Sequence, residues 1–219
     1  MNIDDVKDGA VPSYTFEALE HIFQRQLNLM EKYHPIEAAN GLLLTEAVPV
    51  VLDDRFGQAR LKDFAWRVTE ELAESTEALG NEDNHHALEE TVDALHFLIE
   101  LYILAGVSPL VLAQHRGFLT ADDLLRQAFT PFRQEDKGDP IFQAYSCVED
   151  LGKAMNCLKQ KPWKQTHVLT DRKRFHAHLS NAFYSLLRYA WSIGHTDHSL
   201  FTFYFKKSEV NKFRQRSGY

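Results

Sequence analysis

Apolar residues in this chain recur at intervals of three and four over long stretches with neither glycine nor proline, and this spacing constrains the fold more than any other feature. Residues 14–33 are an example, with apolar side chains at Phe16, Leu19, Ile22, Phe23, Leu27 and Met30. Such spacing places these side chains on one face of an α-helix. No segment keeps the two-residue alternation of a half-buried strand, so the sequence predicts an all-α fold.

Further long helices are predicted from the same periodicity over residues 58–79, 87–105, 141–159, 171–193 and 199–212. Gly80 and Gly106 are expected to end the second and third helices, because glycine adopts the left-handed cap conformation without steric cost. Pro35 is expected to mark a loop after the first helix. A turn-rich linker is expected at 130–140.

Two short helices are predicted in the middle of the chain. Ser108 precedes Pro109, a pair typical of a helix N-terminus. Thr120 with Asp123 resembles a capping box, in which each residue's side chain binds the other's backbone N–H.

A faint internal repeat divides the chain into two halves. Residues 69–75 can be aligned with 148–154, and residues 90–106 can be aligned with 178–194, each of the latter two ending in glycine. Two helical hairpins packed in this way would build a bundle with a shared core. A chance likeness between two amphipathic helix pairs is the alternative.

The expected organisation is a single domain over 1–219. Its first half, about 14–130, carries the acidic site, and its second half, about 140–204, is a degenerate repeat. Three acids of the first half are replaced in the second, where Lys153, His178 and Asn181 stand in place of Glu74, Glu90 and Asp93.

Two acidic pairs form the candidate metal site. Glu71 and Glu74 are three residues apart, as are Glu90 and Asp93, so each pair shares a helix face. The short connection between them makes the two helices antiparallel neighbours. Carboxylates brought so close raise one another's pKa values. Hard divalent cations relieve that repulsion, and ligation by oxygen alone suits Mg²⁺.

Asp93 is the residue that favours a site over a solvated helix surface. It lies within the apolar stretch TVDALHFLIEL, and an acid among apolar neighbours needs a partner. Either pair alone would be read as exposed helix acids, of which Glu70 and Glu77 are further examples.

The last fifteen residues, 205–219, form a basic tail on a chain whose net charge is -7. This tail predicts a binding site for an anion, and a solvated basic end is the alternative. Its charged residues are Lys206, Lys207, Lys212, Arg214 and Arg216 against Glu209.

The overall composition excludes several classes of function. The negative net charge argues against nucleic-acid binding, which depends on a basic surface. The longest apolar run is interrupted by Glu100 and is too short to span a membrane. Cys147 and Cys157 offer no disulfide framework, and the acidic N-terminus has no apolar signal core, so a cytoplasmic location is expected.

Three motifs resemble known families. EELAE at 70–74 followed by ETVD at 90–93 resembles the E-E-x-x-E … E-x-x-D signature of the all-α NTP pyrophosphohydrolases, the MazG-like superfamily. Within it, residues 90–101 are similar to the matching helix of the dimeric-type dUTPases, and FQRQLN at 23–28 resembles their L-Q-x-x-L-N helix.

The C-terminal segment is similar to the closing motif of the same group. The matching residues are Tyr204, Lys207, Asn211, Phe213, Arg214, Gln215, Gly218 and Tyr219. Ser208 replaces a usual Asn, and the family's Trp-Lys stretch after Leu79 is absent, although 161–165 contains a similar one. A related phage group hydrolyses dCTP as well as dUTP with a similar tail, which leaves the base open.

The resemblance implies hydrolysis of dUTP, or of dCTP or a related pyrimidine nucleotide, to the monophosphate and pyrophosphate. A homodimer is compatible with it. Two or more Mg²⁺ ions would be held by Glu71, Glu74, Glu90 and Asp93, and Glu71 or Glu74 would accept the proton of the attacking water.

Substrate contacts are expected from several elements. Lys207 and Arg214 would bind phosphate. Gln24 and Asn28, four residues apart on one helix, would hydrogen-bond the base. The remaining candidates are Phe97 at the sugar, Asn211 and Tyr204 as neutral hydrogen-bonding groups, and Lys161, Trp163 and Lys164 from the second half.

Two other classes of protein remain open. A di-iron carboxylate oxidoreductase builds its site from Glu-x-x-His pairs on a bundle, and Glu31–His34, Glu82–His85 and Asp93–His96 have this or a similar spacing. A non-catalytic nucleotide-binding protein would bind without releasing pyrophosphate.

Overall fold

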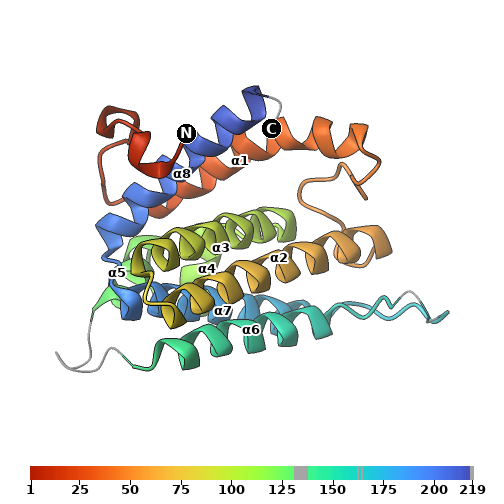
Figure 1. Cartoon of the computed structure of the whole chain (residues 1–219). Coiled ribbons are helices and arrows are strands. Elements are labelled where there is room, and N and C mark those ends of the chain that lie inside the picture. Colours follow the sequence, from red (N-terminus) through yellow and green to blue (C-terminus); the bar gives the residue numbers. More distant parts are fainter. Residues whose placement is uncertain (131–137, 162, 164, 218–219) are drawn as a thin grey trace.

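The computed structural model describes residues 1–130, 138–161, 163 and 165–217. Every regular element in these residues is helical, which confirms the predicted all-α class (Figure 1). Two 3₁₀ turns, η1 (Ile3–Asp5) and η2 (Asp8–Ala10), precede eight helices. The helices are α1 (Ala18–Ala39), α2 (Arg55–Gly80), α3 (Asn84–Ala105), α4 (Pro109–His115), α5 (Ala121–Phe129), α6 (Pro140–Cys157), α7 (Arg172–Ile193) and α8 (Asp197–Arg216).

Two helical hairpins make up most of the bundle, as the internal repeat predicted. The helices α2 and α3 pack along each other, as do α6 and α7, and the hairpins meet through α2 with α6 and α3 with α7 (Figure 1). Both second helices end at a glycine of positive φ, Gly106 at 71° and Gly194 at 119°.

Equivalent positions of the two hairpins also make similar contacts. His178 Nδ1 lies 3.3 Å from Asp150 Oδ1, at the positions that correspond to Glu90 and Glu71 in the first hairpin.

The helix α3 lies at the core, and α1 and α8 pack against it and against each other. Most of its residues are buried, among them Leu98, Leu101 and Tyr102. In the described part of the chain, no single helix could cross a membrane by length and composition, and one bent pair, α3 with α4, passes the same test jointly.

Local signals at helix ends are largely confirmed. The side chain of Ser108 accepts the N–H of Val111, and Thr120 forms its capping box with Asp123. Pro35 does not end the first helix, because α1 continues to Ala39. The predicted linker falls mostly on 131–137, outside the described residues.

The part of the predicted tail up to Arg216 is not a separate segment as expected. It forms the second half of α8, which runs without a break from Asp197 to Arg216. Phe205 and Val210 are buried, so apolar packing holds this half of the helix on the bundle.

Candidate active site

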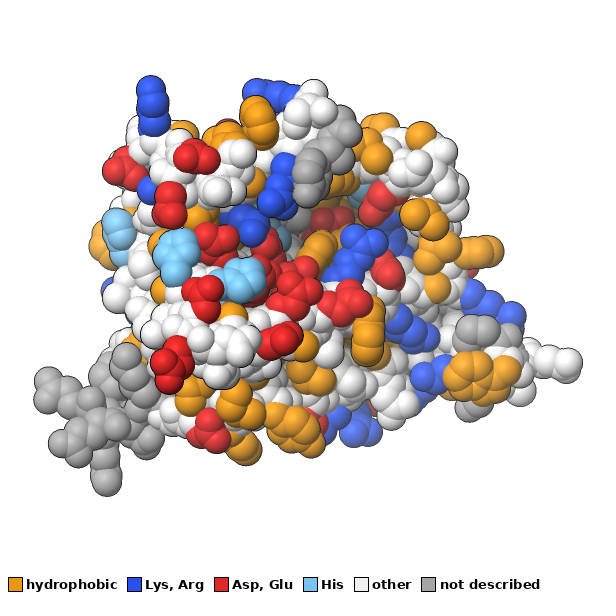
Figure 2. Space-filling model, in the orientation of Figure 1, with side chains coloured by type: hydrophobic (Ala, Val, Ile, Leu, Met, Phe, Trp, Pro, Cys, Tyr) orange, Lys and Arg blue, Asp and Glu red, His pale blue; other side chains and the backbone are white. Residues whose placement is uncertain are grey.

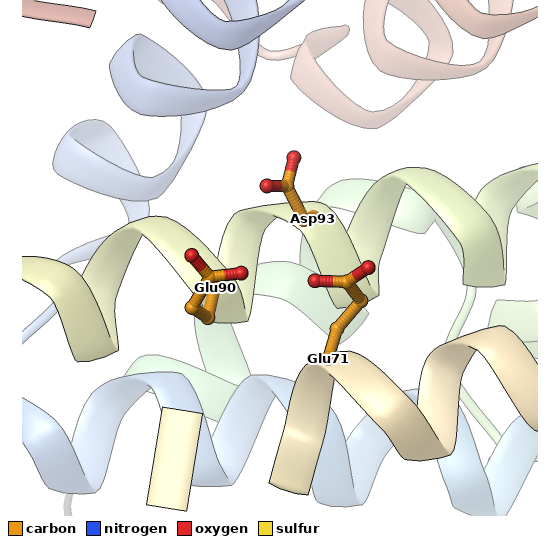
Figure 3. Close-up of side chains that lie close together, drawn as sticks. All are labelled: Glu71, Glu90 and Asp93. Carbon is orange, nitrogen blue, oxygen red and sulfur yellow. The ribbon is translucent and has the colours of Figure 1, made fainter. Parts of the chain in front are cut away.

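Three carboxylates from two helices converge in the first hairpin. Each of Glu71, Glu90 and Asp93 offers an oxygen, and these oxygens all lie within 4.8 Å of one another. Figure 3 shows Glu71 rising from α2 toward the two acids of α3. Ser75 fixes the alignment of the two helices, because its hydroxyl donates to Ala87 O at 2.7 Å.

Burial and neighbouring acids raise the pKa values of Glu71 and Asp93. Burial raises the pKa of Glu71 well above its ordinary range, and a hydrogen bond with Glu90 and repulsion from Asp93 add to the effect. Burial raises the pKa of Asp93 to about 6, although Lys207 opposes the shift. A cluster that gathers this much negative charge is suited to a divalent cation with oxygen ligands.

Glu74, the fourth predicted ligand, does not join this cluster. It lies one turn further along α2 and is exposed, while its charge still raises the pKa of Glu71. Glu89 is an acid that the sequence analysis did not select, and its carboxylate lies 4.0 Å from the ammonium of Lys207.

The cluster opens into a pocket of about 300 Å³ between α1, α2, α3 and α8. Glu71 and Asp93 line it together with the predicted substrate residues Phe97, Asn211 and Arg214. Figure 2 shows acidic and basic side chains gathered around a hollow on one face of the molecule. Lys207 reaches the acidic end, where its ammonium lies 2.5 Å from Asp93 Oδ2.

Arg67 lines the same pocket and was missed by the sequence analysis. Its guanidinium carbon lies 4.8 Å from the ring centre of Phe64 and 5.6 Å from that of Phe97. The sequence feature that could have identified Arg67 is its position four residues before Glu71, which puts both side chains on one face of α2.

The inner end of the pocket is a polar network. Gln26 Oε1 accepts hydrogen bonds from the Tyr204 hydroxyl and from His96 Nδ1, both at 2.8 Å. Gln26 Nε2 donates to Glu100 Oε2 at 2.8 Å. Tyr204 is fully buried and stacks on His96 with ring centres 3.9 Å apart. It therefore supports the network and does not reach the pocket, contrary to the expectation of a substrate contact.

The predicted base-reading residues Gln24 and Asn28 lie elsewhere. Both are exposed, do not line the pocket with the acids, and hydrogen-bond each other at 3.2 Å. Gln26, two residues along α1 from Gln24, faces the pocket instead. Helical rotation of about 100° per residue separates the two faces.

The candidates from the second half also lie apart from the acids. Lys161 and Trp163 line a separate groove with Phe56 and Lys62. Lys164 falls outside the described residues.

The grouping of metal-binding side chains does not match a di-iron centre. Within the described ranges, one group of at least three potential ligands is close enough to share an ion, and it contains carboxylates alone. His34 lies beside Arg60 at 2.9 Å, and Glu31 is exposed.

Comparison with known proteins gives one family. The sequence model of a family described as dUTPase matches residues 71–219, a region that contains the acidic cluster and α8. Curated proteins and solved structures give no match. Since the matched region is more than half of the chain, the protein belongs to the all-α dUTPase family.

Proposed function

We propose that the protein is a Mg²⁺-dependent diphosphatase that converts dUTP and water to dUMP and pyrophosphate. The observation that carries the proposal is the convergence of Glu71, Glu90 and Asp93 within 4.8 Å, in a pocket that Arg214 lines and Lys207 borders. A triphosphate needs both a metal site and cationic side chains, because together they neutralise its negative charge.

The acidic cluster fits Mg²⁺ on chemical grounds. Its donors are carboxylate oxygens, the ligands that Mg²⁺ prefers. Burial, a hydrogen bond with Glu90 and repulsion from the neighbouring acids together raise the pKa of Glu71, and a bound cation would offset the repulsion. Glu71, Glu90 and Asp93 would hold the metal. Bound there, Mg²⁺ would neutralise charge on the triphosphate and lower the pKa of a bound water.

The cationic residues around the pocket would bind and position the phosphates of the substrate. Arg214 presents a guanidinium to the pocket, a group that binds phosphate oxygens in pairs. Arg67 lines the opposite wall from α2, and Lys207 stands at the acidic end. Asn211, which also lines the pocket from α8, adds a neutral amide.

We assign to Glu74 the role of the base that accepts a proton from the attacking water. It lies on the solvent edge of α2, one turn beyond Glu71 and outside the group of three ligands. Proton acceptance there would leave all three ligands charged for the metal.

A screen for pyrophosphate release tests the proposal directly. The common deoxynucleoside and ribonucleoside triphosphates would be supplied one at a time with Mg²⁺, and the nucleotide product identified. We expect pyrophosphate and a monophosphate in equal amounts from dUTP. The second candidate is dCTP, since a carboxyl group at the inner end of the pocket, on Glu100, also suits an exocyclic amine. Release of inorganic phosphate alone, or of nothing, would refute the proposed reaction.

A further inference from the structure

The hydrogen bonds at the inner end of the pocket run in one direction. The side-chain oxygen of Gln26 can only accept, so Tyr204 and His96 are both donors to it. The amide nitrogen of Gln26 is thereby turned toward Glu100 and donates to it. Three helices, α1, α3 and α8, thus fix the amide so that Glu100 is the acceptor at the end of the chain of bonds.

Glu100 is a buried acid that takes no part in the proposed hydrolysis step. Its residue is 5% exposed, and it lines the pocket. Burial of a carboxyl group is costly unless hydrogen bonds compensate for the lost water. A core position on α3 would be better filled by an apolar residue of the same size, so a ligand-binding role is the better explanation of this acid.

The position of Glu100 matches the length of a nucleotide. It follows Asp93 by seven residues on α3, which is two helical turns and about 10 Å along the axis. Phe97 lies between them on the same face and lines the pocket with Phe64 and Leu29. A nucleotide with its phosphates at Asp93 would therefore have its sugar beside Phe97 and its base beside Glu100, between apolar side chains.

We propose that Glu100 recognises the base, accepting a hydrogen bond from the N–H group of a pyrimidine, on N3 of uracil or on the exocyclic N4 of cytosine. This inference rests on the proposed function and names its substrate class as pyrimidine deoxynucleotides with a free N–H at that edge. Gln26 is a positioning residue that holds the carboxyl group, and Gln24 and Asn28 take no part.

The inference is tested by combining a substitution of Glu100 with a methyl group on N3 of the base. The value of kcat/KM would be measured for dUTP and for 3-methyl-dUTP, which lacks the N–H, with the wild type and with Glu100→Ala. We expect the wild type to prefer dUTP by about 10-fold to 100-fold, the range for one hydrogen bond to a charged partner. In the variant this preference should fall to about 1. If dCTP is the substrate, its N4,N4-dimethyl analogue is the matching probe.

Glu100→Leu is a second variant that preserves the packing, because leucine fills the same space with an apolar side chain. It should lose the preference for dUTP to the same extent. Gln24→Ala is the matched control from α1 and should keep the wild-type preference. Loss of activity by the same factor toward both substrates in the Glu100 variants, or an unchanged preference, would overturn the inference. So would a loss of preference in Gln24→Ala alone.

Failure of the inference can be told from failure of the proposed function. Absence of pyrophosphate from every nucleotide with the wild type would refute the function, whatever Glu100 does. Calorimetric binding of α,β-imido-dUTP and its 3-methyl analogue measures base preference without turnover. Equal affinity of the wild type for the two analogues would overturn the role of Glu100 by itself.

Discussion

The ammonium of Lys207 lies 2.5 Å from Asp93 Oδ2, and this ion pair connects α8 to the acidic cluster of the first hairpin. Lys207 is 7% exposed, and Glu89 stands 4.0 Å from the same nitrogen. A buried ammonium needs such partners, because desolvation without them is costly. The C-terminal helix is therefore held where a triphosphate bound to the cluster would also find its cations.

Asp93→Asn is expected to abolish pyrophosphate release while the protein stays folded. Asparagine keeps the shape and an oxygen for Lys207 but removes the charge that holds the metal. Charge stabilisation by a metal contributes several kcal/mol, which corresponds to a loss of about 1000-fold in turnover. Steady-state kinetics with dUTP and Mg²⁺ measure it. Glu77→Gln, an exposed acid on α2, is the control, and near-wild-type turnover by Asp93→Asn would refute the metal site.

Lys207→Met is expected to make the fold depend on Mg²⁺. Without the ammonium, Asp93 keeps its buried charge unpaired or takes up a proton, which limits the cost to about 3 kcal/mol. For a chain of this size that lowers Tm by roughly 6–12 °C. Thermal unfolding with EDTA and with Mg²⁺ would show a larger metal-induced rise in Tm for the variant. An identical rise in both proteins would mean that Lys207 and the metal do not share these carboxylates.

Glu100→Gln is expected to stabilise the protein at high pH. Burial raises the pKa of Glu100 to about 7 from an ordinary 4.5, helped by Glu37 and opposed by Gln26, Arg60 and Arg67. Between these values the folded state holds a proton that the unfolded state has lost, so stability falls as pH rises from about 4.5 to about 7. The full cost, reached above pH 7, is about 3 kcal/mol at 1.36 kcal/mol per pH unit.

Urea unfolding of the wild type and Glu100→Gln in EDTA between pH 4.5 and 8 measures this cost. The two proteins should be equally stable at the acid end and diverge as pH rises. A difference that is constant with pH would contradict the raised pKa.

His178→Gln is expected to leave turnover unchanged. His178 pairs with Asp150 at the position in the second hairpin that corresponds to Glu90 with Glu71 in the first. Neither residue lines the acidic pocket. The half-buried pair contributes about 1 kcal/mol at most. A fall in kcat for dUTP would show that the second hairpin takes part in the chemistry.

Much of this fold could be predicted from the sequence, because it depends on interactions between residues that are close together in the chain. Apolar spacing predicts the helices, and the capping residues Ser108 and Thr120 predict the helix starts because their interactions stay within one turn. The convergence of Glu71, Glu90 and Asp93 was also predictable. Each pair shares a helix face, and the short link forces the two helices to lie side by side.

Contacts that depend on how helices rotate against one another were not predictable. Gln24 and Gln26 are equally good candidates from spacing, and only the packing of α1 against α3 and α8 decides which one meets the pocket. Tyr204 shows the same limit, since its burial behind His96 depends on the position of α8. The dense basic charge of residues 205–219 predicted a separate tail, whereas burial of Phe205 and Val210 holds this part of α8 on the bundle.

Binding of Mn²⁺, a spectroscopic stand-in for Mg²⁺, tests the central claim most directly, because it reports the acidic cluster independently of turnover. Electron paramagnetic resonance of free Mn²⁺ would be followed as wild type, Asp93→Asn or Glu77→Gln is added. The wild type and Glu77→Gln should remove the free-ion signal with saturable binding, and Asp93→Asn should bind at least about 10-fold more weakly. Equal Mn²⁺ binding by the wild type and Asp93→Asn would contradict a metal centre at Glu71, Glu90 and Asp93.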